Sequence, residues 1–169
     1  MGSRPNQYPH PSPLPEGEGE VCEPCDSGSF QVPQSAHHDQ SFSCEVHVIV
    51  ELKKQFLFEA AHHLPHVPAG HKCARVHGHS YRVEVGLRGP VDAQTGWLVD
   101  FALIDEAWSV LQGRLDHHML NQVEGLENPT CENLCGYIWT ALRPRLPQLC
   151  AVTVWETADS CCTYRGEMG

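Results

Sequence analysis

Hydrophobic and polar residues follow a strand period over two stretches of this chain. The segment VHVIVELKKQFLFEAAH, residues 46–62, is rich in β-branched and aromatic residues and predicts a long strand. In HGHSYRVEVGLRG, residues 77–89, apolar side chains fall at every second position and charged ones lie between them. That alternation predicts a second strand with one buried face. The following Gly-Pro pair and the sequence DAQTG indicate a loop.

The second half of the chain begins with two helical patterns. Asp100 and Thr130 are each expected to cap a helix in which apolar residues recur every three or four positions. Alternation returns in AVTVWETA, residues 151–158, and CCTYRG, residues 161–166, is expected to form a last short strand. The order strand, strand, helix, helix, strand, strand (ββααββ) predicts an α+β domain. Its four-stranded antiparallel sheet would carry both helices on one face.

Residues 1–44 differ from the rest in composition. They hold seven of the thirteen prolines and six acidic residues against Arg4 alone, and they show no strand or helix period. We expect a disordered Pro/Gly/Glu-rich extension here and a folded domain over residues 45–169. Cys22 and Cys25 form a Cys-x-x-Cys pair without a second pair nearby, so zinc or redox chemistry is disfavoured. A misassigned start is an equal alternative to a functional tail.

Charge and composition exclude several classes of function. The net charge of −10 argues against a broad nucleic-acid surface, although a local basic cluster could still bind a small anion. No run approaches the roughly 20 apolar residues of a membrane span, and no signal-peptide pattern precedes the domain. Nine cysteines is an odd number, and a chain of this length is too long for a small disulfide-stapled fold. We therefore expect a cytoplasmic protein with reduced thiols.

Half of the twelve histidines lie within residues 58–81. His77 and His79 are two apart in a predicted strand, so both imidazoles point to the same face and can bind one ion. A third imidazole could come from AAHHL, at the end of the preceding strand. Three imidazoles without a thiolate are typical of a catalytic zinc with an open fourth position, although packed or solvated histidines remain an alternative. Three histidines in or beside the Pro-framed loop are left without a role: His63, His66 and His71.

A single cysteine lies within the histidine-rich stretch. Cys73 is flanked by Lys72 and Arg75, and neighbouring cations favour the reactive thiolate form of a cysteine. The alternatives are a fourth ligand, which would close a structural zinc site, and an inert loop cysteine. The flanking charges favour the reactive thiol.

Two acidic residues further along the chain are candidates for a role in proton transfer or binding. Asp116 precedes His117 in RLDHHMLN and could orient an imidazole for proton transfer, though an ordinary surface pair is equally compatible. Glu156 shares a strand face with Val152 and Val154, and a carboxylate at the end of an apolar face needs a specific partner.

These motifs resemble a known family. The stretches FEAAHHLPHVPAGHKCARVHGHSY, GWLVDF, RLDHHMLN, LENPTCEN and ETADSCCTYRGE are similar to the 6-pyruvoyl-tetrahydropterin synthase / 6-carboxytetrahydropterin synthase family. The likeness runs in order from about residue 46 to Glu167, and it is greatest to the bacterial 6-carboxytetrahydropterin synthases of queuosine biosynthesis (QueD). It implies the tunnelling (T-) fold, whose subunits join their sheets into a barrel, here as a homohexamer with active sites at subunit interfaces.

The resemblance also implies roles for individual residues. Zinc is expected to bind His62, His77 and His79. Catalysis is expected from Cys73 as the base and from Asp116 with His117 as a proton relay that crosses a subunit interface. Substrate binding is expected from Glu156, which would accept the N–H groups of the pterin edge, and from Thr130 and Glu132 in the pocket wall. Candidate cations for the phosphates are Lys72, Arg75 and Arg165.

The reaction implied by the family is the conversion of 7,8-dihydroneopterin triphosphate to 6-carboxy-5,6,7,8-tetrahydropterin with loss of acetaldehyde and triphosphate. A glutamate at the position of Cys73 would instead mark a folate-pathway variant.

Two alternative functions remain open. The first is a 6-pyruvoyl-tetrahydropterin synthase, which eliminates triphosphate but keeps the side chain, and the second is a non-catalytic pterin- or metal-binding module. The joint presence of Cys73, Asp116 and His117 argues against the module.

Overall fold

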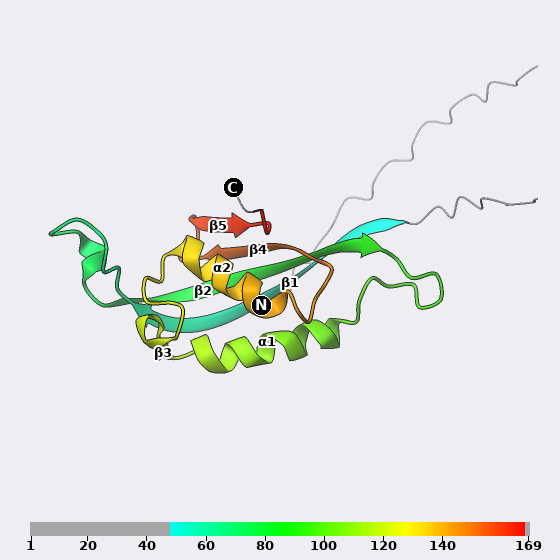
Figure 1. Cartoon of the computed structure of the whole chain (residues 1–169), viewed down its shortest axis with the longest axis horizontal. Helices are drawn as coiled ribbons and strands as arrows, with labels where there is room; N and C mark the ends of the chain where they lie inside the picture. The colour runs from blue at the N-terminus through cyan, green and yellow to red at the C-terminus, as the bar shows by residue number, and fades with distance from the viewer. Residues whose placement is uncertain (1–47, 168–169) are drawn as a thin grey trace, which may run out of the picture. The chain divides into compact units, whose positions relative to one another are not determined.

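A sheet and two helices make up the domain over residues 48–167 (Figure 1). The computed structural model describes residues 48–167, so the predicted extension over residues 1–44, with Cys22 and Cys25, lies outside the described residues. The strands and helices are β1 (Ile49–His62), β2 (His77–Pro90), α1 (Phe101–Leu115), β3 (His118–Met119), α2 (Cys131–Leu142), β4 (Leu149–Trp155) and β5 (Cys161–Tyr164). Short 3₁₀ turns occupy Lys72–Ala74 and Leu120–Gln122.

The sheet has the strand order β3-β1-β2-β4-β5. The four longer strands pair antiparallel, which confirms the predicted ββααββ arrangement. One feature differs from the prediction, because the two-residue strand β3 pairs in parallel with β1 and makes the sheet five-stranded and mixed. Two residues are too few to show a period, so a strand formed only by tertiary pairing leaves no signal in the sequence pattern.

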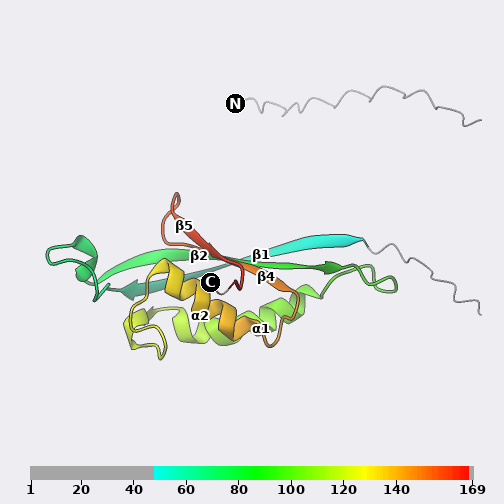
Figure 2. The ribbon, with the colours of Figure 1, turned by 45° about the horizontal axis from the view of Figure 1, so that its top comes forward.

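The core lies between the sheet and the helices, and both helices lie on the same side of the sheet (Figure 2). From β2, the alternating residues Tyr81, Val83, Val85 and Leu87 are fully buried against it. Asp100 and Thr130 cap the helices as predicted, since their side-chain oxygens accept the main-chain N–H groups of Ala102 (2.9 Å) and Asn133 (3.3 Å). Neither helix within residues 48–167 has the length and apolar character needed to cross a membrane.

The pairing of β1 with β2 determines where a site can form. The two strands pair along their whole length, from Ile49 opposite Pro90 to His62 opposite His77. The loop that joins them therefore begins and ends beside these two histidines. Gly78 permits this close approach, because a Cβ there would lie 3.2 Å from the carbonyl oxygen of Ala60.

Candidate metal centre and active site

Three imidazoles converge where β1 ends and β2 begins. His62 is 1% exposed and lies opposite His77, and His79 follows two residues later on the same face. One nitrogen from each ring can be chosen so that the three atoms lie within 4.8 Å of one another. The structure thus brings together the three residues expected to bind zinc, and it separates them from His63, whose main-chain N–H donates to the side chain of Asn121.

The hydrogen bonds of the rings suit a metal cation. His62 Nδ1 lies 2.9 Å from the carbonyl oxygen of Pro129, and His77 Nδ1 lies 2.8 Å from that of Arg75, so each Nδ1 donates its proton to the main chain. The two Nε2 atoms then carry lone pairs and face each other at 3.0 Å. Lone pairs this close repel unless a cation lies between them. In a metal-binding histidine, the ring nitrogen that does not bind the metal usually donates a hydrogen bond, often to a main-chain carbonyl oxygen.

Burial favours the neutral form of the His62 and His79 rings, which is the form that binds metals. Loss of solvent is the main reason that the pKa values of His62 and His79 lie below the ordinary value, and the charges of neighbouring histidines act in the same direction. The main chain of Glu156 raises the pKa of His79 and so partly opposes the shift. Neutral imidazole is the metal ligand, so the site favours a cation.

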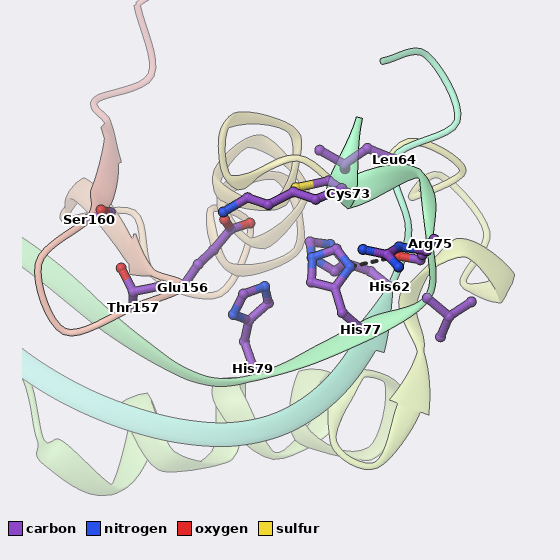
Figure 3. A pocket seen from close by; sticks show the side chains of 11 residues that line it. His62, Leu64, Cys73, Arg75, His77, His79, Glu156, Thr157 and Ser160 are labelled. Atoms are coloured by element: carbon purple, nitrogen blue, oxygen red, sulfur yellow. Dashed lines mark hydrogen bonds between the residues drawn. The ribbon is translucent and has the colours of Figure 1, made fainter. Parts of the chain in front are cut away.

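A cavity of about 550 Å³ opens over the imidazoles (Figure 3). The residues that line it are His62, Leu64, Lys72, Cys73, Arg75, Val76, His77, His79, Glu156, Thr157 and Ser160. The predicted base, the predicted pterin-binding carboxylate and two of the three candidate cations therefore share one cavity with the predicted zinc ligands. The third candidate cation, Arg165, does not line it.

Cys73 is held in the cavity wall by the loop between β1 and β2. It lies in the 3₁₀ turn Lys72–Ala74, where its main-chain N–H donates to Nδ1 of His71 at 3.2 Å. Its carbonyl oxygen accepts the N–H of Leu64 at 2.8 Å. His71, which the sequence pattern left without a role, therefore caps the turn that carries the candidate base.

Glu156 follows β4 directly and enters the cavity (Figure 3). Burial raises the pKa of its carboxyl group, and the nearby charge of Glu132 adds to the increase. This carboxylate takes part in none of the ion pairs of residues 48–167, so it has no cationic partner within 4.0 Å there. A ligand that donates N–H groups to Glu156 would supply the partner that a half-buried carboxylate needs.

Two residues predicted for the pocket wall take other positions. Neither Thr130 nor Glu132 lines the cavity. The Thr130 hydroxyl is engaged in capping α2, and Glu132 acts on the site through its charge on Glu156. Thr157 and Ser160 line the cavity instead, from the turn between β4 and β5. Turn hydroxyls are so common that the sequence contains no signal for their role.

Within one protomer, neither Asp116 nor His117 lines the cavity that contains Cys73. The Asp116 carboxylate lies 3.0 Å from His117 Nδ1, so the predicted pair forms. The His117 side chain is 77% exposed and borders a separate hollow at the edge of the sheet, formed with β1, β2 and β3. His79 borders both hollows.

The mixed sheet, the two helices and the three-histidine cavity define a T-fold protein of the pterin-synthase kind. Residues 51–167 match the family model described as 6-pyruvoyl tetrahydropterin synthase, and the chain belongs to this family. A solved 6-pyruvoyl tetrahydropterin synthase of Caenorhabditis elegans supports the fold. It is 30% identical, with a TM-score of 0.67, and the alignment covers 72% of this chain and 98% of that one.

Two curated relatives carry the name 6-carboxy-5,6,7,8-tetrahydropterin synthase. The protein of Synechocystis sp. is 38% identical over 117 residues, which cover 66% of this chain and 89% of the relative. The protein of Bacillus subtilis is 32% identical over 151 residues, which cover 82% of this chain and 95% of the relative. The resemblance inferred from the motifs is thereby confirmed.

Proposed function

We propose that this protein is a zinc-dependent lyase that converts 7,8-dihydroneopterin triphosphate and one water molecule to 6-carboxy-5,6,7,8-tetrahydropterin, acetaldehyde and triphosphate in queuosine biosynthesis. The observation that carries the proposal is the convergence of three imidazoles, one thiol and one carboxylate on a single cavity. The names of the Synechocystis and Bacillus relatives support the carboxy product.

In this proposal, the zinc ion is held by His62, His77 and His79. A zinc with an open position would act as a Lewis acid toward the hydroxyl groups of the substrate side chain. The main-chain carbonyl groups behind His62 and His77 hold the rings in the tautomer that leaves Nε2 free for the metal.

The remaining groups of the cavity divide the work of binding and proton transfer. Cys73 would remove a proton from the carbon next to the pterin ring, and its place in a short hydrogen-bonded turn limits the distance over which it can move. Glu156 would hold the pterin ring by accepting two N–H groups from its edge. Lys72 and Arg75 line the same cavity and would attract the triphosphate.

The Asp116–His117 pair would complete the cavity of a neighbouring subunit in a homohexamer. The pair lies at the edge of the sheet with an exposed imidazole, which borders a different hollow from the one that Cys73 of its own chain lines. An exposed side chain at a sheet edge is available to a second copy of the chain.

This sharing of sites predicts complementation between two inactive variants. Cys73→Ala and His117→Ala subunits, unfolded together and reassembled, are expected to regain about a quarter of wild-type activity, because random mixing creates that fraction of intact sites. Turnover by the mixture is compared with that of each variant reassembled alone. A co-assembled mixture no more active than its parents would show that the relay does not cross between subunits.

Glu156→Gln tests the pterin contact. The amide keeps the size of the side chain but replaces one acceptor oxygen with a donor, so one N–H group of the pterin would face another N–H group. We expect KM to rise at least about tenfold, since a hydrogen bond to a charged group contributes about 1.5–3 kcal/mol. Steady-state kinetics measure the change, and Thr157→Val provides a control in the same cavity wall. An unchanged KM would remove Glu156 from substrate binding.

The proposed function is tested by mass spectrometry of the product formed from 7,8-dihydroneopterin triphosphate, with zinc quantified in the same preparation. The expected result is 6-carboxytetrahydropterin and about one zinc per chain. A 6-pyruvoyl product would instead assign the activity of the Caenorhabditis relative. Zinc or pterin binding without turnover would favour a non-catalytic module.

A further inference from the structure

The side chain of Asn121 connects two segments of the chain beside the metal site. Its Oδ1 accepts the main-chain N–H of His63 at 2.9 Å, and its Nδ2 donates to the carbonyl oxygens of His63 at 2.8 Å and of Glu127 at 3.1 Å. A main-chain N–H can only donate and a carbonyl oxygen can only accept, so these partners determine which end of the amide is the oxygen. Three directed hydrogen bonds therefore join the residue after β1 to the segment before α2.

The same two segments meet again at His62. Its Nδ1 lies 2.9 Å from the carbonyl oxygen of Pro129, two residues after Glu127. Among residues 48–167, no main-chain hydrogen bond joins residues 62–63 to residues 127–129. The separation between the His62 ring and the Pro129 carbonyl group therefore depends on side chains, and Asn121 provides three of the hydrogen bonds that maintain it.

Each segment is attached to a different part of the fold. The carbonyl oxygen of Asn128 accepts the N–H of Thr130 at 2.9 Å and the side-chain amide of Asn133 at 2.7 Å, so residues 127–129 are bound to the first turn of α2. His62 instead belongs to β1 and pairs with His77 of β2. The Asn121 amide thus links the helix layer to the sheet at the point where the metal ligand lies.

Tyr81 provides a second partner for His62 Nδ1. The Tyr81 hydroxyl oxygen lies 3.3 Å from that nitrogen, farther away than the Pro129 carbonyl oxygen. A carbonyl oxygen can only accept, so its contact requires a proton on Nδ1 and leaves Nε2 free for a metal. A hydroxyl group can also donate, and donation to Nδ1 would leave the ring proton on Nε2. The position of the Pro129 carbonyl group therefore selects the tautomer that binds a metal.

We propose that Asn121 is a positioning residue for the metal centre. By holding residues 127–129 against His63, it keeps the Pro129 carbonyl group within hydrogen-bond distance of His62 and so keeps Nε2 of that ring free. This inference rests on the zinc site of the proposed function. It assigns a role to a residue of the stretch RLDHHMLN for which the family resemblance implied none.

The experiment compares four variants of the full chain with the wild type. Asn121→Asp keeps the acceptor for the His63 N–H but directs an oxygen at two carbonyl oxygens, and Asn121→Ala removes all three hydrogen bonds. His62→Ala tests the metal site itself. Ile138→Val is the control for stability, because it removes one methyl group from a fully buried side chain of α2 that does not line the cavity.

Three quantities are measured without substrate. They are the zinc dissociation constant by competition with a chromophoric chelator, the visible absorption of the Co²⁺-loaded protein, which reports the geometry of the ligands, and thermal unfolding of the metal-free protein. We expect both Asn121 variants to bind zinc about 10- to 100-fold more weakly, which is the usual cost of losing an outer contact of a metal site, and to change the Co²⁺ spectrum. Ile138→Val should lower the unfolding temperature and leave zinc affinity and spectrum unchanged.

The outcomes separate this inference from the metal site. If His62→Ala loses zinc while both Asn121 variants keep wild-type zinc affinity and Co²⁺ spectrum, the positioning role is overturned and the metal site stands. If His62→Ala binds zinc as tightly as the wild type, the metal site of the proposed function is overturned, and the positioning role with it. Asn121 variants that resemble Ile138→Val, with only a lower unfolding temperature, would show that Asn121 is merely structural.

Discussion

Cys73→Ala is expected to lower kcat about 10²- to 10⁴-fold while the protein still folds and still binds zinc. The magnitude is that of losing a positioned general base, and Cys73 is the one thiol among the residues that line the cavity. The residue is half-buried in a turn held by main-chain contacts to His71 and Leu64, and alanine leaves those contacts intact. Turnover and zinc content are measured on the same preparation.

Cys161→Ala is the matched control for the thiol. Cys161 is also free, and it is exposed on β5 outside the cavity, so its replacement should leave kcat unchanged. Chemical modification of Cys161 in the Cys73→Ala background separates general thiol effects from the loss of the base. A Cys73→Ala protein that turns over substrate at the wild-type rate would eliminate the proposed base and direct attention to the histidines.

His77→Ala is expected to remove zinc and activity together. Loss of one of three ligands should weaken zinc binding by more than about 100-fold, because even the removal of an outer-shell partner costs about 10- to 100-fold. The fold should survive, since His77 is only partly buried and its side chain bonds to the Arg75 carbonyl oxygen at the surface. Zinc per chain after dialysis is measured by elemental analysis beside turnover and circular dichroism.

His66→Ala is the control for the metal site. His66 borders a different hollow, beside α2, and lies outside the three-histidine group. Its replacement should change neither zinc content nor turnover. If His77→Ala retained one zinc per chain and full activity, the proposed ligand set would be incorrect. Removal of zinc from the wild type by a chelator, followed by its return, should abolish and restore turnover reversibly.

Much of the fold follows from local sequence patterns. Strand alternation in residues 77–89 identified the buried face of β2, and the caps at Asp100 and Thr130 identified where both helices begin. The same alternation placed His77 and His79 on one face. These predictions succeed because side-chain periodicity and capping depend on residues only a few positions apart.

The third imidazole of the metal site could not be chosen from local sequence patterns. Adjacent residues at the end of β1 were both candidates by position, and only the family resemblance favoured His62 over His63. The structure provides the physical reason, because strand register places His62 opposite His77 with its ring buried, while His63 bonds to Asn121. Register is decided by pairing between distant segments, which periodicity does not reveal.

The sequence alone therefore determined the four longer strands and the two helices, the order in which they occur, and a cluster of histidines able to bind a metal. Only the tertiary structure decided how these parts meet. It showed the carbonyl oxygens of Pro129 and Arg75 behind the imidazoles, β3 beside β1, and His117 and Cys73 in different hollows of one protomer. Every residue has a main-chain carbonyl group, so the sequence does not show which carbonyl groups accept from the imidazoles. Contacts between segments distant in the sequence depend on packing, which the local pattern of side chains does not reveal.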